Sequence, residues 1–316
     1  RLSSFDFLTG IDDFSRMGGF RFKETPDSEF INVSESLKIP PLTDIRELIV
    51  ASAEIEKSEE NNMLPDRKWI AQLVQPGTSL GGARPKANVI DTDKTLYVAK
   101  FPSRKDDYDV GLWEHFSHLL ATKAGINASK TKVLATGEKY HTLLSQRFDR
   151  TNDSKRIHFA SAMTLLGLSD GDNATTEHGY LDIVDFIIQN CTDVERNLQE
   201  LYRRVAFNIC IGNSDDHFRN HGFLLTEKGW ELSPAYDINP TTSEQQSLLI
   251  NRSTNEADLG LLLDAAPDFM ISQNTAKSII DSIKTAMASW RTEAKRFSLP
   301  QRDIDTFGPR IDKWLK

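Results

Sequence analysis

The sequence predicts an α+β protein of two lobes, the first rich in strands and the second mostly helical. Strand-like runs separated by glycine turns dominate residues 69–101, whereas helical periodicity dominates beyond residue 150. With 316 residues, the chain is long enough to build two lobes around substantial cores. We therefore predict an N-terminal lobe over residues 1–148 and a C-terminal lobe over residues 149–316, with a cleft between them.

The first lobe is predicted to combine two helices with several short antiparallel strands. An apolar stripe along residues 42–60 predicts the first helix. A second helix is expected at about residues 107–124, where Gly125 stops it. Strands are expected at residues 69–74, 88–90, 96–101, 132–135 and 141–144.

The second lobe is predicted to be helical, with one strand–turn–strand element. Helical patterns cover residues 180–190, 194–212 and 276–297. The strand pair is expected at residues 222–225 and 229–232, around a turn at residues 226–228.

Composition and charge exclude several classes of protein. Hydrophobic residues make up 39% of the chain, which is too many for a disordered protein. The formal net charge is −8, from 38 Lys and Arg against 46 Asp and Glu, which argues against autonomous nucleic-acid binding because a phosphate backbone is gripped by clustered cations. No apolar run approaches the roughly 18 residues of a membrane-spanning helix. Two cysteines are too few for a disulfide scaffold, so we expect a cytoplasmic protein.

The densest polar cluster covers residues 213–221, between an apolar helix and a strand. Asp215 and Asn220 are five positions apart, which is the spacing of a catalytic loop for phosphoryl transfer. In such a loop the Asp accepts the proton of an incoming hydroxyl, and the Asn amide oxygen ligates Mg²⁺. Asp237 follows beyond the strand pair and would complete a metal site, although by itself it could simply cap the turn before Pro240.

A cation that could hold phosphates lies upstream, at the end of a strand. Lys100 ends the run 96–100, where strand alternation places its amine on the face opposite Ala99. Taken singly, it reads as an ordinary surface lysine. On the helix that follows, Glu114 could anchor this amine, with Asp107 and Asp109 as competing partners.

A glycine-bearing loop at residues 77–86 precedes this lysine. Gly81 and Gly82 would allow backbone amides to approach an anion closely, and Arg84 and Lys86 add positive charge. The loop matches neither the Walker A pattern nor Gly-x-Gly-x-x-Gly, so it could also be a plain hairpin turn.

Zinc is the alternative metal. His217 and His221 are four apart, which would suit a zinc pair on a helix. However, no third ligand is well placed, and the neighbouring Asp and Asn oxygens favour a harder ion.

Together these segments resemble the HipA family of bacterial Ser/Thr kinase toxins, which are usually paired with a small DNA-binding antitoxin. The resemblance is carried by the catalytic-loop and metal segments at residues 207–225 and 232–240, and by further segments upstream. Those are residues 79–86, 98–102, 146–150, 161–167 and 180–182. The matching segments follow the family's order from about residue 70 to residue 240. The resemblance makes the expected fold protein-kinase-like.

The resemblance implies roles for the polar residues of the second lobe and the hinge. Asp215 would be the catalytic base, and Asn220 and Asp237 would hold Mg²⁺. Residues beside the nucleotide would be His217 and Tyr236. Gln146 and Phe148 would offer hinge backbone groups to adenine, although the family often has Glu where Gln146 stands.

The resemblance also implies a phosphate-binding set in the first lobe. Lys100 would meet the phosphates of ATP, and the loop would cover them with Gly81, Gly82, Ala83, Arg84 and Lys86. Ser79 occupies the position that family members autophosphorylate, and a doubly negative phosphoserine there would repel the triphosphate.

The expected function is therefore an ATP- and Mg²⁺-dependent Ser/Thr protein kinase. The family suggests an aminoacyl-tRNA synthetase as protein substrate and a HipB-like DNA-binding antitoxin as partner, with no direct nucleic-acid or membrane binding expected of the chain alone. Two alternatives stay open: a small-molecule or lipid kinase with the same core, and a catalytically silent relative that only holds an antitoxin.

Overall fold

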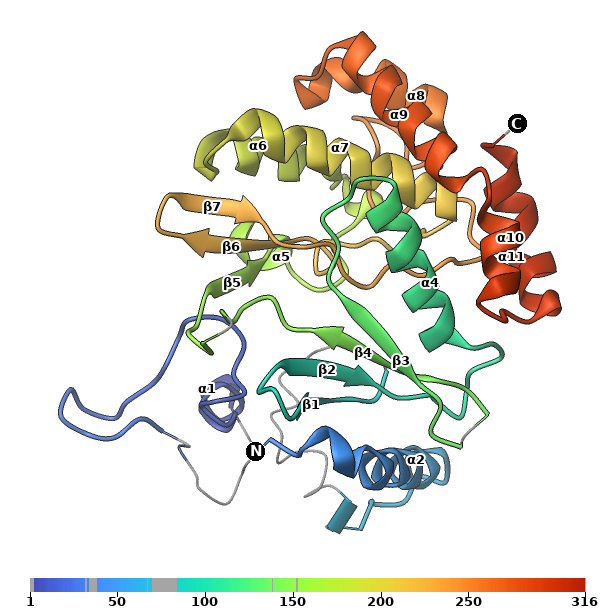
Figure 1. Cartoon of the computed structure of the whole chain (residues 1–316). Coiled ribbons are helices and arrows are strands. Elements are labelled where there is room, and N and C mark those ends of the chain that lie inside the picture. The colour runs from blue at the N-terminus through green and yellow to red at the C-terminus, as the bar shows by residue number, and fades with distance from the viewer. Residues whose placement is uncertain are drawn as a thin grey trace. The chain divides into compact units, whose positions relative to one another are not determined.

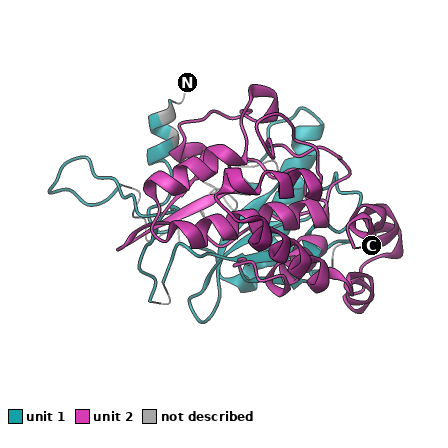
Figure 2. Cartoon of the chain, turned by 90° about the horizontal axis from the view of Figure 1, so that it is seen from above, with its two compact units in different colours: residues 1–112, 130–158 teal, residues 113–129, 159–316 magenta. Residues whose placement is uncertain are grey.

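The computed structural model describes residues 3–31, 33, 39–66, 68–69, 84–137, 139–151 and 153–315. The chain divides into two units (Figure 2). Unit 1 contains residues 1–112 and 130–158, and unit 2 contains residues 113–129 and 159–316. The predicted lobe boundary after residue 148 stays a prediction.

A four-stranded antiparallel sheet forms the framework of unit 1. Its strands are β1 (Lys86–Ile90), β2 (Leu96–Lys100), β3 (Thr131–Leu134) and β4 (Thr142–Gln146), in the order β1-β2-β4-β3. The helices that precede the sheet are α1 (Ser4–Thr9), the 3₁₀ turn η1 (Leu42–Asp44) and α2 (Ile45–Glu60).

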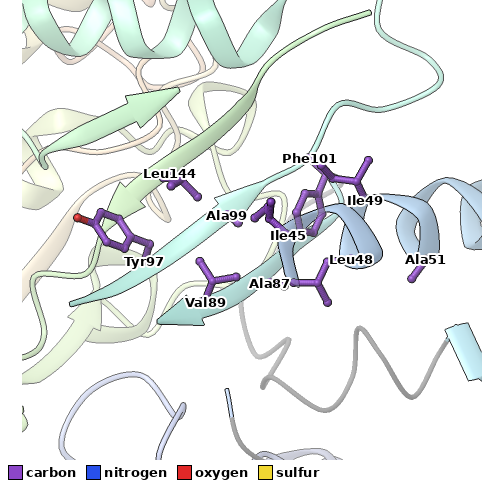
Figure 3. Packing of buried hydrophobic residues seen from close by; sticks show 10 residues of the cluster. All are labelled: Ile45, Leu48, Ile49, Ala51, Ala87, Val89, Tyr97, Ala99, Phe101 and Leu144. Atoms are coloured by element: carbon purple, nitrogen blue, oxygen red, sulfur yellow. The ribbon is translucent and has the colours of Figure 1, made fainter. Parts of the chain in front are cut away.

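The core of unit 1 lies between α2 and one face of this sheet (Figure 3). The helix supplies Ile45, Leu48 and Ile49, which the 3.6-residue period places on one stripe. The strands supply alternate residues, because successive side chains of a strand point to opposite faces. The strand residues of this core are Ala87, Val89, Tyr97, Ala99 and Leu144. Lys86 and Lys100, which are out of phase with them, belong to the other face.

An N-terminal strap, residues 13–18, is bound by the segment that follows β4. Arg147 donates to strap carbonyl groups at 2.6 and 3.3 Å, and Arg150 does so at 3.0 and 2.8 Å. Asp149 accepts a strap backbone N–H at 2.8 Å and also pairs with both arginines, and Arg156 donates to further strap carbonyls. Because Arg147 and Asp149 are buried, this ion-pair network belongs to the interior of unit 1.

Unit 2 is mostly helical around a small sheet. Its sheet joins β5 (His158–Ser161), β6 (Gly222–Thr226) and β7 (Gly229–Leu232) in that order. The helices α6 (Tyr180–Asn190) and α7 (Val194–Ile211) pack along β7, and α7 also packs against α9 (Gln273–Met287; Figure 1). The remaining elements are α5 (Ala162–Leu165), η2 (Ala174–Thr176), α8 (Leu259–Asp264), η3 (Ala266–Phe269), α10 (Trp290–Arg296) and α11 (Gln301–Lys313). The division between the units falls within α4 (Val110–Lys123), after residue 112.

The predicted elements are confirmed where the structure describes them, with two corrections. The predicted helix at residues 276–297 is wrong as a single element, because the chain breaks between α9 and α10 at Ala288 and Ser289. The strand predicted at residues 69–74 is wrong at Trp69, which is helical, and its other residues lie outside the described part of the chain. Among the helices that the structure describes, none is long and apolar enough to cross a membrane.

Candidate functional site

The predicted catalytic loop, residues 212–221, begins where a glycine ends α7. Gly212 adopts a left-handed conformation (φ 80°), and the N–H groups of Gly212 and Asn213 both donate to the Asn208 carbonyl, at 3.0 and 2.9 Å. A Cβ at this glycine would lie 2.9 Å from the Arg310 side chain. The close packing and the positive φ both favour glycine here, so the loop leaves α7 in a defined direction.

Within this loop, the backbone of Asp215 is tied down while its side chain is exposed. The Asp215 carbonyl accepts the Asn220 side-chain amide at 3.0 Å and the His217 N–H at 3.1 Å. The first bond uses the amide nitrogen of Asn220, which leaves the amide oxygen as the group that can ligate a cation. The predicted base and the predicted metal ligand are thus brought together by a direct contact.

Asp237 interacts electrostatically with Asp215 and has an unusual backbone conformation. Its φ is 59°, a left-handed conformation that few residues other than glycine, asparagine and aspartate adopt. Partial burial raises the pKa of Asp215; the charge of His217 opposes this rise, and the carboxylates of Asp237 and Asp216 add to it. The repulsion between the Asp215 and Asp237 carboxylates is the kind that a bound cation relieves.

Tyr236 is held from two sides. Its hydroxyl donates to the Arg219 carbonyl in the catalytic loop, and its ring meets Phe159 edge-on at a centroid distance of 6.2 Å. Burial raises the pKa of the Tyr236 phenol. Phe159 packs so closely on Gly222 that a Cβ there would lie 2.2 Å from the Phe159 ring. The segment carrying Asp237 is therefore fixed by packing as well as by hydrogen bonds.

Sequence reasoning missed two polar contacts next to the site. Asp216, which follows the predicted base, is a buried residue whose carboxylate binds groups on three elements of unit 2. The second contact joins Asn239 to Glu114 of α4, whose carboxylate accepts the Asn239 amide at 3.1 Å. The available signal for the first contact was Asn208, the polar residue within the otherwise apolar stretch 205–211. A polar side chain in a buried helix is expected to have a buried hydrogen-bond partner.

Asp109, one of the competing partners predicted for Lys100, has other contacts. Asp109 accepts the backbone N–H groups of Leu112 and His141 and also pairs with the His141 ring. Its carboxylate is therefore already used to hold the start of α4 in place. The predicted pairing of Lys100 with Glu114 stays a prediction.

In unit 1, two of the predicted phosphate-binding cations are neighbours. Lys86 of β1 and Lys100 of β2 are direct register partners and share one face of the sheet. Two cationic side chains therefore stand opposite each other on this face of the sheet. Arg84, by contrast, forms a two-pronged ion pair with Asp106 at 2.7 and 2.5 Å.

The structure describes the predicted hinge and, of the predicted phosphate loop, only residues 84–86. The Gln146 backbone N–H donates to the Lys130 carbonyl at 2.8 Å, so a contact of this residue with adenine would use its carbonyl. Phe148 is half-buried beyond the end of β4. The predicted residues Ser79, Gly81, Gly82 and Ala83 lie outside the described residues.

The donor set in unit 2 fits a hard divalent cation. In the described part of the chain, no group of three or more His, Cys, Asp and Glu side chains is arranged to hold a metal ion. The predicted ligands are one carboxylate and one amide, both oxygen donors, and Mg²⁺ bound in this way completes its shell with phosphate oxygens and water. His221 donates its Nε2 to Asp216, so this nitrogen is engaged within the protein.

Comparison with known proteins identifies relatives of the chain. The family model of the HipA-like C-terminal domain matches residues 78–290. The Ser/Thr-protein kinase toxin HipA of Shewanella oneidensis is 26% identical over 224 residues, which are 63% of this chain and 50% of that protein. Toxin YjjJ of Escherichia coli is 24% identical over 230 residues, or 69% of this chain and 48% of that protein. The chain thus spans about half the length of these relatives.

A solved structure shares the fold. The complex of HipA, HipB and operator DNA from Shewanella oneidensis matches with a TM-score of 0.71 and 18% identity, over 99% of this chain and 78% of the matched chain. The predicted α+β, kinase-like fold is confirmed by this match.

Proposed function

The chain belongs to the HipA-like C-terminal domain family, and from this premise we propose that it is a kinase that transfers the γ-phosphoryl group of ATP to a serine or threonine hydroxyl of a protein. The observation that carries the proposal is the grouping of Asp215, Asn220 and Asp237 in unit 2. Phosphoryl transfer needs mainly positioning and charge stabilisation, and these three side chains supply the base and two oxygen ligands.

Asp215 acts as the base in this proposal. As the hydroxyl oxygen attacks the γ-phosphorus, its proton passes to the Asp215 carboxylate. The bond from the γ-phosphorus to the bridging oxygen breaks, and ADP leaves with that electron pair. The raised pKa of Asp215 supports this role, because it makes the carboxylate a stronger proton acceptor.

Asn220 and Asp237 hold Mg²⁺, which when bound neutralises charge on the phosphate oxygens. Lys86 and Lys100 bind phosphate oxygens from the shared face of β1 and β2. Residues 81–86 of the loop cover the phosphates. The predicted neighbours of the nucleotide, His217 and Tyr236, with Gln146 and Phe148 at the adenine, complete the proposed site.

Regulation and partners are proposed from the family. Ser79 is proposed as the autophosphorylation site. The solved relative is a complex with HipB and operator DNA, and we extend this by proposing a HipB-like antitoxin as partner and the cytoplasm as location. The proposed substrate is a protein, with an aminoacyl-tRNA synthetase as the first to test.

The test is phosphoryl transfer from γ-labelled ATP with Mg²⁺, followed as label on the protein and as ADP release. Asp215→Asn is expected to lower the rate by about 10²–10⁴-fold, the range of general-base catalysis. Asp237→Asn is expected to lower it and to weaken the dependence on Mg²⁺. Asp281→Asn, an exposed aspartate on α9, is the matched control and should leave the rate unchanged.

The outcomes separate the alternatives. Label that maps to residue 79 and disappears in Ser79→Ala supports autophosphorylation there. Transfer only to small molecules would favour the small-molecule or lipid kinase. Wild-type protein that binds an antitoxin but consumes no ATP would be the silent relative, and the proposed function would be wrong.

A further inference from the structure

A fully buried carboxylate lies next to the proposed base. Asp216 is 3% exposed, and its Oδ2 accepts hydrogen bonds from the side chains of Tyr180, Asn208 and His221, at 2.7, 2.7 and 2.9 Å. Burial raises the pKa of Asp216, but the charge and hydrogen bond of His221, followed by the other two bonds, lower it below its ordinary value. A buried charge that is kept ionised by three donors is costly to build, so its position calls for an explanation.

The three donors come from two helices beside the catalytic loop and from the last residue of the loop itself. Tyr180 opens α6, Asn208 lies in the last turn of α7, and His221 immediately precedes β6. Asn208 also accepts the Asn213 side-chain amide at 3.2 Å. The carboxylate therefore joins the helix before the loop, the end of the loop next to β6 and a neighbouring helix at a single point.

The loop presents its two aspartates in opposite directions. The Asp216 side chain is buried and that of Asp215 is exposed, across the tight turn that the bond from the His217 N–H to the Asp215 carbonyl closes. The Asp215 backbone is held in turn by the Asn220 amide. Fixing the buried aspartate consequently fixes the direction of the exposed one and the distance to Asn220.

Little free space exists behind the loop. A cavity of about 10 Å³ lies there, close to the smallest volume that holds one water molecule. Its lining includes Asp216, Asn208 and His221 of the network together with Asn220 and Tyr236 of the proposed site. The network and the proposed metal side of the loop thus pack around the same small space, and a shift of one is transmitted to the other.

We propose that the Asp216 carboxylate is a positioning group that holds Asp215 and Asn220 in the geometry required for phosphoryl transfer. This assignment rests on the proposed function. Asp216 itself touches neither nucleotide nor substrate and acts through its two neighbours in the loop.

The test compares wild type, Asp216→Asn, Asp215→Asn and the double variant, measured as kcat and KM for ATP. Asp216→Asn keeps the shape of the side chain and removes its charge. It should lower kcat by about 10–100-fold, the cost of misplacing a reacting group by roughly 1 Å, with little change in the KM for ATP. Because the group acts partly through Asp215, the same substitution should cost less in the Asp215→Asn background, where only its effect on Asn220 is left. Asp185→Asn, exposed on α6, is the control and should behave as wild type.

Each remaining outcome decides the assignment. An equal loss in both backgrounds would show a general loss of folded protein and overturn it, as would an unchanged kcat. If Asp216→Asn does not fold, Tyr180→Phe removes a single donor and should give a smaller loss of kcat at unchanged KM for ATP; no loss would overturn the assignment. An inactive wild type would overturn the proposed function and this assignment together, whereas an active wild type with a normal Asp216→Asn would overturn the assignment alone.

Discussion

Replacing Asp149 by Asn should destabilise unit 1 by several kcal/mol. The carboxylate accepts Arg147 Nε and Nη2 at 2.9 and 2.7 Å, Arg150 Nη1 at 2.6 Å and the Gly18 N–H at 2.8 Å. The side chain of Asp149 is 0% exposed, and those of Arg147 and Arg150 are 1% and 5% exposed. The substitution keeps the volume but leaves two buried guanidinium groups without a counter-charge. Breaking a buried ion pair on one side costs about 3–5 kcal/mol.

The assay is urea denaturation followed by far-UV circular dichroism, with hydrogen exchange over residues 12–20 to assign the transition to unit 1. The control is Asp153→Asn, the same chemical change at a carboxylate whose side chain is 61% exposed and which pairs with Lys155 at 3.0 Å. Exposed pairs contribute about 0–1 kcal/mol, so the control should shift the midpoint little. If the two variants shifted the midpoint equally, the reasoning from burial would be refuted.

Three further outcomes are expected. Burial raises the pKa of Asp149, but Arg147 and the other partners lower it below its ordinary value. The contribution of Asp149 to the free energy of unfolding should therefore be complete above the unfolded pKa of about 3.9 and be lost as pH falls through the lower folded pKa. Free energies of unfolding measured against pH should accordingly differ between wild type and Asp149→Asn near neutral pH and become equal only in acid. Gly222→Ala should displace Phe159 and cost about 1–3 kcal/mol by overpacking, with a higher KM for ATP; an unchanged melting temperature would contradict the 2.2 Å approach. Burial raises the pKa of both Cys191 and Cys210 to about 12, so iodoacetamide at pH 8 should label them only in denaturant, which mass spectrometry of folded and unfolded protein would check.

Local periodicity was sufficient to predict most elements. The stripe along α2 reflects burial on one side, and the structure buries that face, whereas the apolar end of α7 is buried on all sides over residues 204–211. The break between α9 and α10 escaped prediction because Ala288 and Ser289 are neither glycine nor proline, and a turn made of such residues is set by packing. α11 was missed because it carries Pro309.

The candidate site was predicted where its residues are close in sequence. The five-residue spacing of Asp215 and Asn220 predicted that both belong to one loop, and in the structure the Asn220 amide binds the Asp215 carbonyl, while their catalytic roles stay a prediction. The partners of Asp216 could not be predicted in this way, because Tyr180 lies 36 residues away and a helix-start tyrosine has many uses. Long-range polar contacts of this kind depend on how helices stack, which a periodic pattern does not encode.

The strap has a consequence for synthesis of the chain on the ribosome. Gly18 and Asp149 are 131 residues apart in sequence, so the strap, once made, must wait for its partners. At about 5–20 residues per second the delay is roughly 7–26 s. During that time the strap lacks its arginine donors, while Phe14 and Phe20, which stay 45% and 65% exposed even after folding, are available to other chains. Nascent chains stalled before residue 147 should therefore expose the strap more than chains extended beyond residue 156, which limited proteolysis of stalled chains at residues 13–18 would check.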